Sequence, residues 1–277
     1  MRVACLLTLC SAVSYAQDAR EIVVRSLARH NQNSQIARDF TFVERTEVRD
    51  LNDKSGKGGR SRTYEVRILG GSPYRRLIAR DDKPLSPDED REEQQKLLDC
   101  IARRRAETAE ERAQRIDEWE KKRREFRDPL AEIPKAFHFR IVGEETVNGV
   151  ETRVIEAFPR PGYKPGEGYA RFFPKIKARF WISKTDYGCV KADAEVLETI
   201  SYGYVLARVQ KGSRLQFEQA RVQGGVWVPM RVEATAALQF ALLKSMHTGF
   251  EITYKDYRRF EVESHLTGFH EFTEPLQ

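Results

Sequence analysis

Val147-Asn148-Gly149-Val150 is the clearest turn signal in this chain, because it sets Asn-Gly between two β-branched residues. A two-residue turn of type I′ needs a positive φ at both central positions, and Asn-Gly meets that need with little strain. Similar signals recur at hairpin spacing at 185–188, 210–213 and 223–225. The apolar and aromatic runs around them predict strands over 178–182, 190–196, 202–209, 215–222, 226–236, 250–257 and 260–262. Strands joined in sequence by tight turns make an antiparallel meander.

Upstream of this region, the period of two continues. Phe40 and Phe42 alternate with polar residues as a half-buried strand requires, and the alternation returns after a glycine-rich loop at 52–59, from Tyr64 to Ile68. These two runs predict a long antiparallel hairpin. Before them, Asp18 to Asn31 carries apolar residues at three- and four-residue spacing, which predicts a helix packed by one face.

Residues 86–127 differ from the rest of the chain. Ser86-Pro87-Asp88-Glu89 has the form of a capping box, and Thr108 to Glu111 repeats it, so two helices are expected. Their surface is almost wholly charged, and the thin apolar stripe suffices to pack one face on a sheet. The basic runs are solvated helix faces or, alternatively, contacts for anionic lipid head groups. The apolar residues are Leu97, Leu98 and Ile101 in the first helix, and Ile116, Trp119 and Phe126 in the second.

These patterns together predict the fold class. A large meander must curl, close or be covered by helices, because an exposed flat sheet would aggregate. We therefore expect a mainly β (α+β) protein with a single curved antiparallel sheet or half-barrel meander. The N-terminal helix and the inserted charged helical hairpin are its natural cover.

The first sixteen residues predict export. Arg2 supplies a positive start, Val3 to Val13 is apolar, and Ser14-Tyr15-Ala16 places small residues at a signal-peptidase cut. A buried N-terminal helix and acylation at Cys10 are the alternatives, and the bulky residue before Cys10 disfavours the second. We therefore divide the chain into a signal peptide, 1–16, and one β-rich domain, 17–277, with a helical insertion at 86–127.

Composition excludes some partners. The formal net charge is +6 at pH 7, and the charged residues, 32% of the chain, are mixed in sign, which is typical of a solvated surface. No one-sign basic stripe interleaved with aromatics is present, so nucleic acid is not expected as a partner. Cys100 and Cys189 are the cysteines beyond the signal segment. An oxidising compartment would permit them to pair, and the sequence leaves open whether they do.

We find no motif for catalysis. The five histidines have no metal-binding spacing, and no nucleophile elbow, phosphate-binding loop or dinucleotide-binding glycine pattern occurs. Cys189 has no matched histidine, so we interpret it as a core thiol. No enzyme activity, metal site or cofactor is therefore predicted.

Much of the chain resembles uncharacterised exported proteins of diderm bacteria, a group that is itself similar to the LolA-like superfamily of periplasmic lipoprotein carriers. The resemblance implies an antiparallel sheet wrapped around helices, with an apolar concave face that takes up acyl chains. It also implies a location in the periplasm or at the outer membrane. The segments that carry the resemblance are 73–80, 83–86, Phe158 to Tyr163, Ala178 to Ile182, Lys211 to Ser213, Val226 to Pro229 and Tyr254 to Phe260.

Two functional hypotheses follow. The first is a non-enzymatic envelope carrier for a lipid, an acylated protein or another amphiphile, held by inward-facing strand residues. The candidates are Phe180 and Ile182 on one face of their strand, Trp181 on the other, and Trp227. The alternative is a structural or assembly component that binds proteins through the helical hairpin or a sheet edge. The sequence leaves open whether the concave face is a cavity or a filled core.

Overall fold

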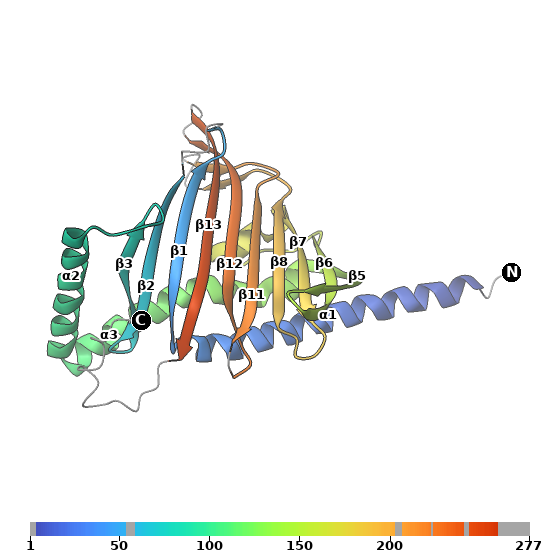
Figure 1. Ribbon diagram of the computed structural model, residues 1–277. Coiled ribbons are helices and arrows are strands. Elements are labelled where there is room, and N and C mark those ends of the chain that lie inside the picture. The colour runs from blue at the N-terminus through green and yellow to red at the C-terminus, as the bar shows by residue number, and fades with distance from the viewer. Residues whose placement is uncertain (1–3, 54–58, 203–206, 223, 241–243, 260–277) are drawn as a thin grey trace.

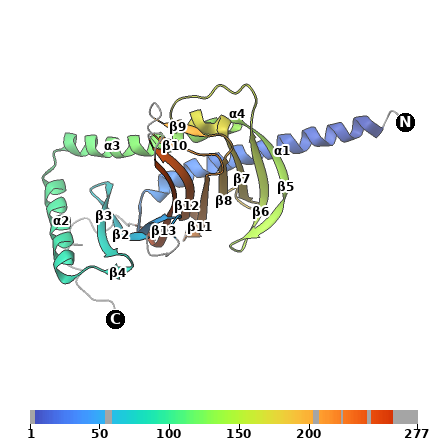
Figure 2. The ribbon, with the colours of Figure 1, turned by 90° about the horizontal axis from the view of Figure 1, so that it is seen from above.

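The computed structural model describes residues 4–53, 59–202, 207–222, 224–240 and 244–259. Within these ranges the strands form one 13-stranded antiparallel sheet with the order β4-β3-β2-β1-β13-β12-β11-β8-β7-β6-β5, and β10 pairs with β12 and β9 beside this path. The sheet is curved and does not close (Figures 1 and 2). This confirms the predicted mainly β fold.

The sheet consists of two meanders. The first contains β1 (Phe40–Asp50), β2 (Arg60–Leu69), β3 (Ser72–Arg80) and β4 (Lys83–Pro84). The second begins at β5 (Phe137–Val147) and ends at β13 (Lys244–Arg259). Pairing of β1 with β13 joins them, with Val48 opposite Phe250. The predicted hairpin of β1 and β2 is confirmed, with Val48 opposite Arg60. The other strands of the second meander are β6 (Val150–Pro159), β7 (Ile176–Ser183), β8 (Cys189–Val196), β9 (Ile200–Tyr202), β10 (Ala207–Val209), β11 (Arg214–Val222) and β12 (Val226–Phe240).

The described turns join the strands as predicted, with 185–188 between β7 and β8, 210–213 between β10 and β11, and 224–225 between β11 and β12. Asn148 (φ 50°) and Gly149 (φ 77°) join β5 to β6, which confirms the type I′ expectation. The strand expected over 202–209 is instead two short strands, β9 and β10, and the residues between them lie outside the described part. The strand expected at 260–262 also lies outside the described residues.

Helix α1 (Ala4–Ala37) enters the curve of the sheet with its C-terminal part, while its N-terminal part projects beyond β5 (Figure 2). The helix predicted over 18–31 is present and continues to Ala37. Ala19, Ile22 and Val23 are buried and form a core with residues of β5, β6 and β7. No described helix has the length and apolar character needed to span a bilayer. The signal peptide stays a prediction.

Helix α2 (Pro87–Ala106) lies beside β3, which the two-residue edge strand β4 covers only at Ala79 and Arg80. Its predicted capping box is confirmed, because Ser86 and Glu89 satisfy each other's backbone N–H groups. Arg104 anchors the helix by donating to the carbonyl oxygens of Leu69 (2.6 Å) and Ser72 (2.9 Å) at the turn between β2 and β3. Helix α2 therefore protects a sheet edge that would otherwise be open.

Helix α3 (Ala109–Arg127) crosses the open side of the curve from the β3 edge toward the β5 edge (Figure 2). Thr108 and Glu111 form the second predicted capping box. In the N-terminal half of α3, Arg115 donates to the carbonyl oxygen of Gly70 (3.1 Å). At the other end the chain passes through η1 (Asp128–Glu132) and α4 (Ile133–Ala136) into β5. A further short helix, η2 (Gly168–Lys175), leads into β7.

Candidate functional site: the concave face of the sheet

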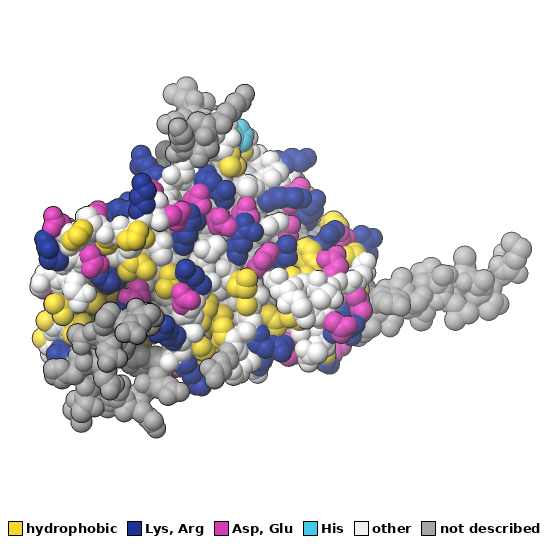
Figure 3. Space-filling model, viewed as in Figure 1, with side chains coloured by type: hydrophobic (Ala, Val, Ile, Leu, Met, Phe, Trp, Pro, Cys, Tyr) yellow, Lys and Arg dark blue, Asp and Glu magenta, His cyan; other side chains and the backbone are white. Residues whose placement is uncertain are grey.

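The convex face of the sheet is a network of ion pairs. Glu156 on β6 contacts Arg140 (2.8 Å) and Arg179 (2.6 Å) on the two neighbouring strands. These two guanidinium groups lower the pKa of the Glu156 carboxyl, with Arg140 the larger cause. Arg231 pairs with Glu251 (2.6 Å) farther along the sheet. Figure 3 shows acidic and basic side chains interspersed over this face. Because these charges satisfy one another, the convex face offers little to a ligand.

The concave face is filled over β5, β6 and β7. Ile155 and Ala157 are 0% exposed, and Ile182 is 2% exposed. They pack with α1 and with Ile133 and Ala136 of α4 in one core. The sequence left open whether the concave face is a cavity or a filled core. Over these strands it is a filled core.

The concave face over β8, β11, β12, β13 and β1 is different. Residues that lie opposite one another on successive strands form a row across the sheet. One such row begins at Ile155 and Phe180 and continues through Ala192, Phe217, Val232 and Ile252. All four are only half-buried. The next row runs through Ala194, Leu215, Ala234, Phe250 and Val48.

Two large apolar side chains in this second row are exposed to solvent. Leu215 is 47% exposed and Val48 is 49% exposed, although both lie on the side of the sheet that faces the helices. Ala192, Ala194 and Ala234 lie between the larger side chains of the two rows. We call the two rows from β8 to β1 the open concave face. It is an apolar surface that the described helices leave partly uncovered.

The structure places the sequence-predicted residues in three different environments. Ile182 belongs to the core beneath α1, and Phe180 packs against that core at the border of the open concave face. Trp181 points the opposite way, as strand alternation requires. Its Nε1 donates to Glu145 Oε2 (2.7 Å), and the Lys191 ammonium lies 5.3 Å from its ring centroid.

Trp227 is 1% exposed and is held by the β7–β8 loop. Its Nε1 donates to Asp186 Oδ2 (3.0 Å), and the Arg221 guanidinium lies 5.0 Å from its ring centroid. Burial raises the pKa of Asp186, but the hydrogen bonds from Trp227, Ser183 and the Gly188 backbone N–H, with the charge of Arg221, together outweigh burial, so the net pKa shift is downward. Gly188 lies directly against the indole. In this conformation, Trp227 therefore has a role in packing.

The described residues bring no catalytic group to this face. Burial raises the pKa of the Cys189 thiol to about 12, so the thiolate needed for nucleophilic attack is scarce at neutral pH. Cys100 and Cys189 are both free, one on α2 and the other on β8. Among the described residues, no group of three or more His, Cys, Asp and Glu side chains is placed to hold a metal ion.

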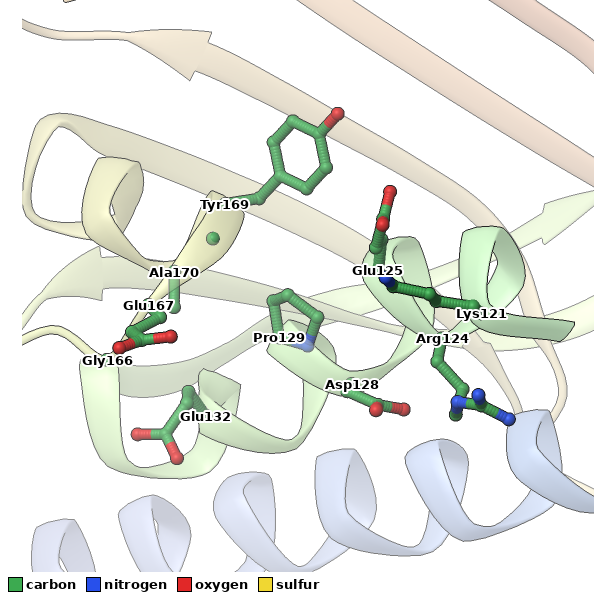
Figure 4. A pocket seen from close by; sticks show the side chains of 11 residues that line it. Lys121, Arg124, Glu125, Asp128, Pro129, Glu132, Gly166, Glu167, Tyr169 and Ala170 are labelled. Atoms are coloured by element: carbon green, nitrogen blue, oxygen red, sulfur yellow. The ribbon is translucent and has the colours of Figure 1, made fainter. Parts of the chain in front are cut away.

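A shallow groove of about 510 Å³ lies apart from the sheet, between α3, η1 and the segment that enters η2. Figure 4 shows Glu132 and Glu167 on one side of Pro129, and Lys121 and Arg124 on the other. The Tyr169 ring stacks on Phe126, which is 65% exposed, with the ring centroids 5.2 Å apart. Its lining is mixed in charge and has no one-sign field for a charged ligand.

The sequence did not point to four residues of this face as site candidates: Leu215, Phe217, Val232 and Ile252. Their alternation with charged neighbours was visible and did predict strands. Alternation alone cannot tell which of several inward rows lies beneath a helix, because that depends on the position of α1 against the sheet.

Comparisons with solved structures find remote relatives. A DUF1329 family protein from Desulfovibrio piger matches with 12% identity and a TM-score of 0.33, covering 90% of this chain and 98% of that one. A domain assigned to outer membrane lipoprotein-sorting proteins, from Vibrio parahaemolyticus, matches with 12% identity and a TM-score of 0.34 over 90% and 95% of the two chains.

A LolA superfamily protein from Nitrosomonas europaea matches with 12% identity and a TM-score of 0.28, covering 87% of this chain and 92% of that one. This chain is remotely similar to LolA-like proteins. The sequence resemblance and this match name the same superfamily. No protein-family model and no curated protein sequence matches the chain.

Proposed function

We propose that this protein is a non-enzymatic carrier or binding protein of the cell envelope for a lipid, an acylated protein or another amphiphile, bound on the open concave face. The observation that supports this proposal is the contrast within one register row. Ile155 is 0% exposed, while Val232 and Ile252 farther along are half-buried. Folding normally covers such residues, so a partly uncovered apolar face inside a curve is typical of a binding surface.

The affinity that a carrier needs suits an acyl chain as ligand. Burial of a methylene contributes about 0.8 kcal/mol, and micromolar affinity corresponds to about 8 kcal/mol. Roughly ten buried methylenes, plus a margin for ordering costs, would therefore be needed. An acyl chain supplies that number, whereas a small polar metabolite does not. Phe180 is the sequence-predicted residue that borders this face, and Ile182, Trp181 and Trp227 stay predictions as ligand contacts.

A titration with a fluorescent fatty-acid probe tests the proposal. We expect saturable binding that a Leu215→Asp substitution weakens about tenfold or more, because the new carboxylate would have to lose water beside the acyl chain. Phe158→Asp is the matched control, since Phe158 is 42% exposed and points away from the core residue Ala157 that precedes it. Binding by that control should be unchanged.

The alternative function, an assembly component that binds proteins, makes the opposite prediction. A folded, lipid-free preparation that shows no saturable binding would remove the carrier proposal. Native mass spectrometry of gently extracted protein is an independent check, because a carrier should retain bound lipid.

A further inference from the structure

We infer that Arg60 and Arg62 form an anion-binding end of the open concave face, so that the ligand is an anionic amphiphile with a carboxylate or phosphate head. This inference rests on the proposed function and names the ligand class that the site takes. It follows from where the two apolar rows end on β2.

The register carries both rows onto these arginines. Val48 ends one row and lies opposite Arg60, and Thr46 ends the other and lies opposite Arg62. Ser61, between the two arginines, lies opposite Glu47, which belongs to the convex ion-pair network. Side chains alternate along a strand, so Arg60 and Arg62 lie on the concave side with Val48 and Thr46.

Neither guanidinium group has an ion-pair partner among the residues that the structure describes. Arg60 and Arg62 are exposed, and no described acidic side chain forms an ion pair with either. By contrast, Arg45 on the convex side of β1 contacts both Asp82 (2.6 Å) and Glu47 (2.8 Å).

The acids on the same side of the sheet have other partners. Glu44 pairs with Arg75, and Asp50 accepts a hydrogen bond from the backbone N–H of Asn52 (2.9 Å). Arg80, opposite Arg62, contacts Glu89 on α2 (3.4 Å). Two unpaired cations at the margin of an apolar surface complement an anionic head group joined to an acyl chain.

The distances along the sheet agree with this arrangement. From β2 to β11 the path crosses β1, β13 and β12, which makes four inter-strand spacings of about 4.8 Å, or roughly 19 Å. One leaflet of a bilayer, half of a hydrocarbon core of about 30 Å, is roughly 15 Å deep. An acyl chain of a membrane lipid would thus reach from Arg60 across three spacings, about 14 Å, to Ala234 on β12, one strand short of Leu215.

Competition titrations against the fluorescent probe test the inference. The ligands are 1-myristoyl lysophosphatidate, uncharged 1-myristoylglycerol of the same chain length, and inorganic phosphate. The wild-type protein should bind the lysophosphatidate at least tenfold more tightly than the glycerol ester. An Arg60→Gln/Arg62→Gln double variant should lose that preference while binding the uncharged ester as before.

Arg103→Gln is the matched control, because Arg103 is an exposed arginine on α2 and should leave both affinities unchanged. Equal affinity for the two esters, an equal effect of the double variant on both, or competition by inorganic phosphate as strong as that of the lysophosphatidate would overturn the inference. If neither ester bound to the folded protein, the proposed function itself would fail, which distinguishes the two failures.

Discussion

The two halves of the concave face begin from the same kind of sequence and end in different states. Over β5 to β7, the inward residues Ile155, Ala157 and Ile182 are buried beneath α1. Over β8 to β1, inward residues of similar type, such as Val232 and Ile252, are half-buried, and Leu215 is 47% exposed. The difference lies in the cover and not in the strands. The end of α1 does reach β12, where Ala37 packs against Phe40, Val226 and Val228, but Val232 and Ile252 lie farther along their strands and are not part of that core. One curved sheet can therefore provide both a core for stability and a surface for binding.

The largest expected effect is on the free energy of unfolding, when isoleucine is replaced by alanine in each half of the concave face. Ile155→Ala should destabilise the protein by about 2–4 kcal/mol, because it leaves a cavity in a filled core. Ile252→Ala lies in the same register row, and we expect it to cost about 1 kcal/mol because that side chain is already partly in water. Urea unfolding measures both. Equal costs would mean that the two halves are equally filled, and the comparison would be broken.

A glycine in the β7–β8 loop tests how tightly the loop packs around Trp227. A Cβ at Gly188 would lie 2.1 Å from Trp227 Nε1, so Gly188→Ala should cost about 1–3 kcal/mol as the indole is displaced. Gly143→Ala is the control, since nothing lies within 4 Å of its Cβ position and its φ is not positive. Thermal unfolding and indole fluorescence should change for the first variant only.

Arg104 of α2 holds the helix against the β2–β3 turn, beyond the open concave face. Arg104→Gln removes hydrogen bonds to the carbonyl groups of the β2–β3 turn and should cost about 1–2 kcal/mol. The neighbouring Arg103 is exposed, so Arg103→Gln should change the free energy of unfolding by less than about 0.5 kcal/mol. Hydrogen exchange of the β2 and β3 amides should rise in the first variant. Unchanged protection there would show that α2 does not hold this edge.

The smallest expected effect is a dependence of the free energy of unfolding on pH, which comes from ion pairs on the convex face behind both halves. Arg140 and Arg179 lower the pKa of Glu156, and Lys177 and Arg214 lower that of Glu195. A carboxyl whose folded pKa lies below its unfolded value of about 4.3 stabilises the fold above that pH. The stabilisation is lost as the pH falls through the folded pKa.

Urea unfolding between pH 6 and pH 2 checks this pH dependence. Glu156→Gln should remove a contribution below about 1 kcal/mol at pH 6 and should have less effect at pH 2. An effect of Glu156→Gln that is the same at both pH values would contradict the role of the ion pairs.

Local chemistry was sufficient to determine much of this protein. Asn148-Gly149 required a type I′ turn wherever it lay, and Ser86 and Thr108 began their helices, because these preferences depend on a few adjacent backbone groups. Alternation determined that Phe180 and Ile182 share a face that Trp181 does not. The tertiary structure alone decided that β1 pairs with β13, that α1 packs on β5 to β7 and on the start of β12, and that Arg60 ends an apolar row. These features join residues far apart in the chain, where the free energy depends on register and packing that no local pattern encodes.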